Sequence, residues 1–126
     1  MRSLGKHLLA ELFGCNTEII NNVELVEEHM KTSATLSGAT IVQSVFHTFS
    51  PYGVSGVVIV AESHLAVHTW PEHDYAAVDF FSCGNLDCET AISNLRLRFC
   101  AERFKMKKIE RGVLEELTRR KEDFFI

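Results

Sequence analysis

The feature that most constrains this chain is an eight-residue run at positions 54–61 that is apolar on both alternating faces of a strand. Successive side chains of a β-strand point to opposite faces of the sheet, so a run of this kind needs cover on both sides. The 126 residues, 46% of them hydrophobic, suffice for one domain with a sizeable core. The sequence therefore predicts a single domain, residues 1–126, built around a buried strand.

Strands are expected where β-branched and aromatic residues cluster between turn residues. These segments are 6–13, 39–49, 54–61, 65–70, 75–82 and, more weakly, 104–109. Apolar residues spaced three and four apart predict two helices. One is capped by Asn22 and closed by Gly38, and the other is capped by Asp87. A charged helix is expected at 113–121.

Tight turns between successive strands favour a mostly antiparallel sheet with the helices on one face, which is an α+β fold and a two-layer α/β sandwich. Two amphipathic helices cover only one face of such a sheet. The run at 54–61 therefore predicts that the other face is buried against a second copy of the chain, in a homodimer. The alternative is a central strand covered by loops and side-chain stems.

Charge and segment length narrow the function class. The net charge is -4, and no basic tract is denser than Lys105, Lys107 and Lys108, so nucleic acid is not an expected partner. No apolar run approaches the ~20 residues of a membrane-spanning helix, so we expect no membrane association. Residues 1–14 lack an uninterrupted apolar stretch, and the four cysteines lack paired spacing. A cytoplasmic protein with free thiols is expected.

Reactive side chains crowd between positions 55 and 83. They are Ser55, Glu62, Ser63, His64, His68, Trp70, Glu72, His73, Asp79 and Cys83. A metal site built from the three histidines with Asp79 or Cys83 would lack the short paired spacings of structural zinc sites, so we expect no metal. A Cys83–His68 pair would suit nucleophilic chemistry, but a free cysteine at a strand end is equally compatible with packing.

Ser63 and His68 present a geometric problem. They are five residues apart and lie on opposite faces of a straight strand. Their cooperation requires a bend at Ser63.

A dense motif covers residues 47–72, with the sequence HTFSPYGVSGVVIVAESHLAVHTWPE. It resembles the signature region of the prokaryotic S-adenosylmethionine decarboxylase proenzymes. YAAVD at 75–79, SCG at 82–84, LGKH at 4–7 and GATIV at 38–42 are similar to that family too. The resemblance is ungapped to about Gly84 and weaker from Asn85 onward. Asp74 departs from it, because many members have glycine there.

The family's members are pyruvoyl enzymes that make their prosthetic group by self-cleavage before a serine. The resemblance implies a cut between Glu62 and Ser63 that yields a beta chain, 1–62, and an alpha chain, 63–126. Ser63 Oγ would attack the Glu62 carbonyl, and His68 would remove the Cα proton of residue 63 to leave a pyruvoyl group. Ser55 would assist by hydrogen bonding to the oxyanion or the intermediate.

In the cleaved enzyme, the resemblance implies that the amine of S-adenosylmethionine forms a Schiff base with the pyruvoyl carbonyl. Cys83 would protonate the carbanion left after decarboxylation, and the product would enter spermidine biosynthesis. Phe49, Trp70 and Glu72 resemble family positions that line the substrate site, and Glu11 is a further carboxylate there. Ordinary packing or solvated charge is the alternative role for these four residues.

Other functions remain open at this point. Relatives with the same pyruvoyl chemistry act on arginine or ornithine. A non-catalytic regulatory homologue would bind a partner enzyme, although retention of Ser63, His68 and Cys83 together disfavours it. A metal-dependent hydrolase built on the histidines is the third alternative.

Overall fold

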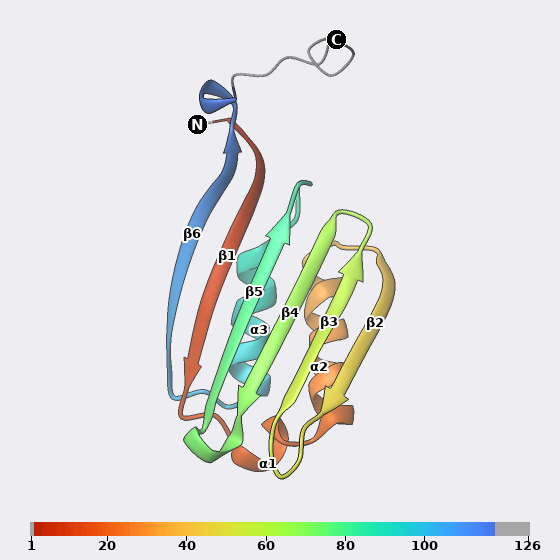
Figure 1. Cartoon of the computed structure of the whole chain (residues 1–126), viewed down its shortest axis with the longest axis vertical. Coiled ribbons are helices and arrows are strands. Elements are labelled where there is room, and N and C mark those ends of the chain that lie inside the picture. The colour runs from red at the N-terminus through yellow and green to blue at the C-terminus, as the bar shows by residue number, and fades with distance from the viewer. Residues whose placement is uncertain (1, 118–126) are drawn as a thin grey trace.

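Six strands form one antiparallel sheet in the computed structural model, which describes residues 2–117 (Figure 1). The strands are β1 (Ser3–Phe13), β2 (Ile41–Thr48), β3 (Val54–Val60), β4 (Ser63–Trp70), β5 (Tyr75–Ser82) and β6 (Arg103–Val113). Their order across the sheet is β2-β3-β4-β5-β1-β6, and each neighbouring pair is antiparallel. Both long helices lie on the same face of the sheet. The predicted α+β two-layer sandwich is confirmed.

The helices begin at the expected residues. For α2 (Val23–Leu36), the Asn22 side chain accepts a hydrogen bond from the Leu25 N–H, and Gly38 follows the helix with a φ of +93°. For α3 (Cys88–Arg98), the Asp87 carboxylate accepts from the Thr90 N–H. The sequence did not predict α1 (Thr17–Ile20), because four residues are too few for an apolar period.

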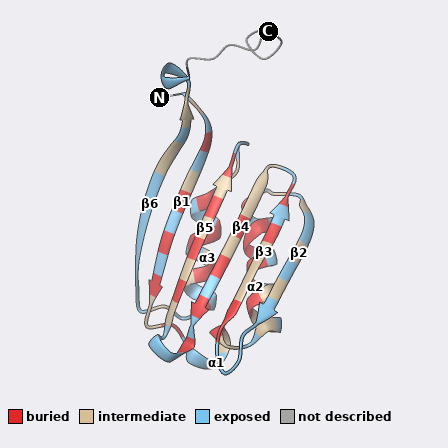
Figure 2. Ribbon diagram, viewed as in Figure 1, coloured by how far each residue is buried: buried red, intermediate tan, exposed pale blue. Residues whose placement is uncertain are grey.

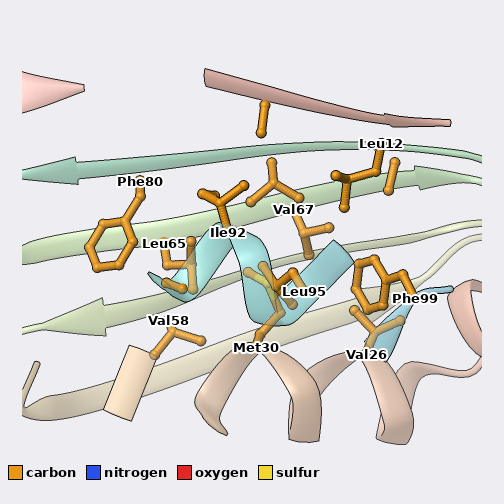
Figure 3. Packing of buried hydrophobic residues seen from close by; sticks show 14 of the residues in the cluster. Leu12, Val26, Met30, Val58, Leu65, Val67, Phe80, Ile92, Leu95 and Phe99 are labelled. Carbon is orange, nitrogen blue, oxygen red and sulfur yellow. The ribbon is translucent and has the colours of Figure 1, made fainter. Parts of the chain in front are cut away.

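The core lies between the sheet and the two long helices. Every second side chain of the central strands points toward α2 and α3, where Leu65, Val67 and Phe80 are fully buried with Ile92 and Leu95 (Figure 3). This dry layer fixes the register of β4 and β5, because a slip of one residue would turn their apolar side chains to the opposite face.

The second face of the sheet, which we call the open face, has no helix over it within residues 2–117 (Figure 2). The apolar run at 54–61 is divided between the two faces. Val54, Val58 and Val60 are buried under the helices, whereas Val57 and Ile59 lie on the open face, and Ile59 is 39% exposed. Burial of the open face by a second copy stays a prediction.

The expected helix at 113–121 is wrong in its described part. β6 continues to Val113 because its backbone stays paired with β1, and only a short 3-10 helix, η2 (Leu114–Glu116), follows. The Leu114 N–H donates to the Arg2 carbonyl, which prolongs this pairing. Residues 118–121 lie outside the described part of the chain.

None of the helices in residues 2–117 combines the length and the apolar character that spanning a membrane requires.

Two leucines of α3 allow a matched test of the core. We expect Leu95→Ala to lower the free energy of unfolding by about 2–5 kcal/mol, because Leu95 is fully buried. Leu97→Ala, in the same helix but 74% exposed, should change it by less than about 0.5 kcal/mol. Urea denaturation of both variants measures the difference, and equal losses would contradict this description of the core.

Candidate active site

The predicted site residues form two groups at opposite ends of β4. Ser63 begins the strand and pairs with Val60 and Ser82, whereas His68 pairs with Ser55 and Ala77. The pairing is continuous between them, so the bend that cooperation within one chain would need is absent from β4. Five residues of strand separate Ser63 from His68 by about 16 Å, at about 3.3 Å per residue.

At the first end, the Glu62 carbonyl accepts two hydrogen bonds from Cys83. The Cys83 amide nitrogen lies 3.1 Å from the carbonyl oxygen, and its sulfur lies 3.0 Å away. Two donors on one carbonyl polarise it and would stabilise a negative charge that developed on its oxygen. This is the carbonyl that the side chain of Ser63, the next residue, would have to attack.

The turn between β3 and β4 is held close to the end of β5, which positions this carbonyl. The Ala61 N–H donates to the Thr40 carbonyl at 2.8 Å, which ties the turn to the segment before β2. On the other side, Gly84 leaves room for the Glu62 side chain, since a Cβ at Gly84 would lie 2.9 Å from its Cγ. A side chain at position 84 would require the Glu62 side chain to shift.

At the second end, Ser55 and His68 form a hydrogen-bonded pair on the open face. Ser55 Oγ lies 2.7 Å from His68 Nδ1, and the two residues are register partners of β3 and β4. A hydrogen bond between the Ser55 hydroxyl and Nδ1 orients the imidazole and leaves its Nε2 available for proton transfer. Cys83 follows Ser82, the register partner of Ser63, and so lies at the other end of β4 from His68. The chain does not form the Cys83–His68 pair by itself.

A pocket of about 280 Å³ surrounds this second group. It brings together five of the predicted site residues, which are Phe49, Ser55, His68, Trp70 and Glu72. Tyr52, which the sequence interpretation omitted, lines it as well. The pocket offers aromatic rings beside one carboxylate, a combination suited to a cation that also carries hydroxyl groups.

Buried hydrogen bonds fix the backbone around this pocket. Thr69 Oγ1 donates to the Ile20 carbonyl at 2.8 Å and accepts from the Val54 N–H at 2.9 Å. The Gly53 N–H donates to Asn21 Oδ1 at 2.9 Å, and Gly53 has a φ of +108° that favours glycine. The short helix α1 therefore anchors the loop that carries Phe49.

Asp74, the position at which the sequence departs from the resembled motif, follows the short 3-10 helix η1 (Pro71–His73). Its φ is +51°, in the left-handed region where aspartate is tolerated better than most residues. The Thr17 hydroxyl donates to its carboxylate, which ties this turn to α1.

Glu11 lies outside this pocket. Its carboxylate accepts a hydrogen bond from the Tyr75 hydroxyl at 2.9 Å, and the Tyr75 ring lies 5.5 Å from that of Trp70. Burial, together with the bond to Glu11, raises the pKa of Tyr75 to about 12, so this hydroxyl stays a donor. Glu11 and His68 both line a larger cavity of about 640 Å³ on the open face, which also contains Lys105 and Lys107.

The histidines do not assemble as the metal hypothesis required. His64 and Asp79 lie together, but their neighbour is His7 and not His68 or His73. Arg111 lies 3.0 Å from His7 Nδ1 and can only donate, so His7 Nε2 carries the proton in the neutral ring. This tautomer offers no lone pair to a cation at Nε2, and the guanidinium charge repels one. The two-histidine, one-carboxylate cluster is therefore better suited to hydrogen bonding than to metal binding.

The fold and these two groups define a small α+β enzyme whose reactive side chains lie on an antiparallel sheet. Residues 6–112 match the family model described as S-adenosylmethionine decarboxylase. A Thermotoga maritima protein named S-adenosylmethionine decarboxylase proenzyme is 51% identical over 118 residues, covering 93% of this chain and 91% of its own. One of the same name from Acetivibrio thermocellus is 50% identical, with coverage of 92% and 94%. The crystal structure of the adenosylmethionine decarboxylase from Aquifex aeolicus is 33% identical, with a TM-score of 0.83 over 95% of this chain and all of its own.

The chain belongs to the S-adenosylmethionine decarboxylase family. The resemblance noted from its motifs is thereby confirmed, and it extends beyond Gly84 to residue 112.

Proposed function

We propose that this chain is a self-processing S-adenosylmethionine decarboxylase that cleaves itself between Glu62 and Ser63. The observation that carries the proposal concerns the Glu62 carbonyl, which directly precedes Ser63. This carbonyl accepts hydrogen bonds from both the N–H and the thiol of Cys83. The cut would give chains 1–62 and 63–126, with a pyruvoyl group derived from Ser63. The family membership supports the same reaction.

The first step is the transfer of an acyl group within the chain. Ser63 Oγ attacks the Glu62 carbonyl carbon, and the amide nitrogen of residue 63 leaves with a proton, so that an ester replaces the peptide bond. Negative charge passes through the Glu62 carbonyl oxygen during this step. The two Cys83 donors lie where they would stabilise that charge.

The second step needs a base. Removal of the Cα proton of residue 63 breaks its Cβ–Oγ bond, so Oγ departs as part of the Glu62 carboxylate and dehydroalanine remains, which water converts to pyruvoyl and ammonia. His68, oriented by Ser55, is the base that the family resemblance assigns. Because His68 lies about 16 Å along β4 from Ser63 in the same chain, we infer that the base comes from a second copy.

A twofold axis that runs across the strands supplies this arrangement. If two open faces pack with such an axis between them, the Ser63 end of one sheet lies over the His68 end of the other. The Ser63 side chain lies on the helix side with its register partners Val60 and Ser82, so His68 of the second copy would approach the backbone of residue 63 from the opposite face. The open face also carries the apolar side chains such contact would bury, among them Leu9, Val45 and Ile59. The homodimer would therefore complete two equivalent sites, each with Ser63 and Cys83 from one chain.

Substrate binding would use the aromatic pocket beside His68. Phe49 and Trp70 provide ring faces for the sulfonium and adenine, and Glu72 provides acceptors for the ribose hydroxyls. A pyruvoyl group supplies a carbonyl that captures the substrate amine and accepts the electrons released with carbon dioxide. Cys83, whose sulfur lies 3.0 Å from the carbonyl oxygen of Glu62, the residue before Ser63, would return a proton to the substrate carbon.

The product, decarboxylated S-adenosylmethionine, would serve spermidine synthesis. We place the protein in the cytoplasm, where the four free cysteines of the chain would stay reduced.

Cleavage between Glu62 and Ser63 can be read directly from the masses of the chains. Denatured wild-type protein should give two masses, for 1–62 and for a pyruvoyl-blocked 63–126, whereas Ser63→Ala should stay intact because it lacks the attacking hydroxyl. Ser93→Ala, on the exposed side of α3, is the matched control and should be cleaved like the wild type. A wild-type chain that remains whole would rule out the proposed function.

The second prediction concerns the shared site. Ser63→Ala and His68→Ala should each fail to cleave alone, the latter stalling as a hydroxylamine-sensitive ester. Co-expressed, they form mixed dimers in which one site combines Ser63 of the His68→Ala chain with His68 of the other. We expect cleavage of the His68→Ala chain only, read by mass spectrometry. Mixed dimers that stay intact would exclude a base from the second copy.

The third prediction concerns the substrate. The cleaved enzyme should release carbon dioxide from S-adenosylmethionine and not from arginine or ornithine. Glu72→Gln should raise KM for S-adenosylmethionine about tenfold with little change in kcat, because a charged hydrogen bond that is made equally in ground and transition states is lost. The control is Glu89→Gln on α3, which is exposed and should leave KM unchanged. An unaltered KM in Glu72→Gln would remove Glu72 from the binding site.

A further inference from the structure

Asp79 lies between two histidines on the open face. Its Oδ2 is 2.8 Å from His7 Nε2 and 3.4 Å from His64 Nε2. The three residues come from β5, β1 and β4, three neighbouring strands. One carboxylate oxygen thus links the strand that begins at Ser63 to the strand on the far side of β5.

The direction of the hydrogen bond between His7 and Asp79 is set from β6. Arg111 lies 3.0 Å from His7 Nδ1, and a guanidinium has donors only, so Nδ1 accepts. The proton of His7 is then on Nε2 and points at Asp79. Asp79 is held by His7 on one side and presents the same oxygen to His64 on the other.

A packed aromatic ring keeps the two histidines in place. Phe81 is the register partner of both His7 and His64, and its ring lies 5.4 Å and 6.0 Å from theirs. Gly5 on β1 makes room for this ring, because a Cβ there would lie 2.6 Å from Phe81 Cζ. Phe81 also lies two residues before Cys83, so this cluster adjoins both groups at the cleavage end.

We propose that His64 is a positioning residue for residue 63, and that Asp79, His7 and Arg111 act through it. The inference rests on the proposed function, because it concerns what happens once the bond between Glu62 and Ser63 is cut. Residue 63 then becomes a chain terminus, and the covalent restraint from the β3–β4 turn is lost. The next side chain along, His64, remains anchored to Asp79 and holds the terminus in its place on β4.

The test uses the cleaved enzyme, so that processing and turnover are measured separately. His64→Leu should lower kcat about tenfold and change KM less than about twofold, because the reactive terminus is displaced while the substrate pocket is intact. His64→Gln keeps a side-chain N–H that can reach Asp79 and should recover most of kcat. His29→Gln on α2, away from the open face, is the control and should match the wild type.

Coupling between the residues gives a second measurement. Asp79→Asn removes the charge from the acceptor and should also lower kcat, and His64→Leu/Asp79→Asn should be no slower than the slower single variant. Multiplying losses would mean that the two residues act independently and would overturn the proposal. So would a His64→Gln enzyme as slow as His64→Leu.

Arg111→Met keeps the proposal testable if the His64 variants do not fold, because Arg111 is exposed on an edge strand. We expect kcat to fall about threefold without a change in KM, since His7 can then take either tautomer. An unchanged kcat would overturn the proposal that Arg111 acts on residue 63 through His7, Asp79 and His64. A wild-type chain that is not cleaved at all would instead overturn the proposed function.

Discussion

The pairing of β4 with both neighbours from Ser63 to His68 determines where the reactive side chains of this protein lie. A strand embedded on two sides cannot bend without breaking two ladders, so Ser63 and His68 stay about 16 Å apart at opposite ends. The buried side chains Leu65 and Val67 lock this register from the helix side. The distance between Ser63 and His68 is therefore fixed by packing in the core as well as by strand pairing.

The two ends of the sheet are stabilised by different means. At the Ser63 end, backbone contacts from the segments beside β2 and β5 hold a turn, and a glycine at position 84 allows close approach. At the other end, α1 anchors the pocket loop through Asn21 and the buried Thr69 hydroxyl. Each end is thus built from parts of the chain that are distant in sequence, and the open face is the surface that connects them.

Much of this arrangement could be predicted from the sequence. Helix caps at Asn22 and Asp87 and the strands between 54 and 82 follow from local residue patterns, and the motif around Ser63 identified the family. Long-range pairing could not be predicted in the same way. The predicted helix from 113 did not begin there because β6 stays paired with β1 as far as Val113. The contact between His7 and Asp79 depends on the register of two strands, in residues 72 positions apart in the sequence. Local propensity carries no information about either.

The strand order has a consequence for a chain cut after residue 62. The first fragment would contain β1, β2 and β3, and the second β4, β5 and β6. Because β1 is inserted between β5 and β6, the fragments are interleaved within one sheet. The ladders β3–β4, β5–β1 and β1–β6 would all join one fragment to the other. Neither fragment could dissociate without breaking them, so the cut chain would still behave mechanically as a single body.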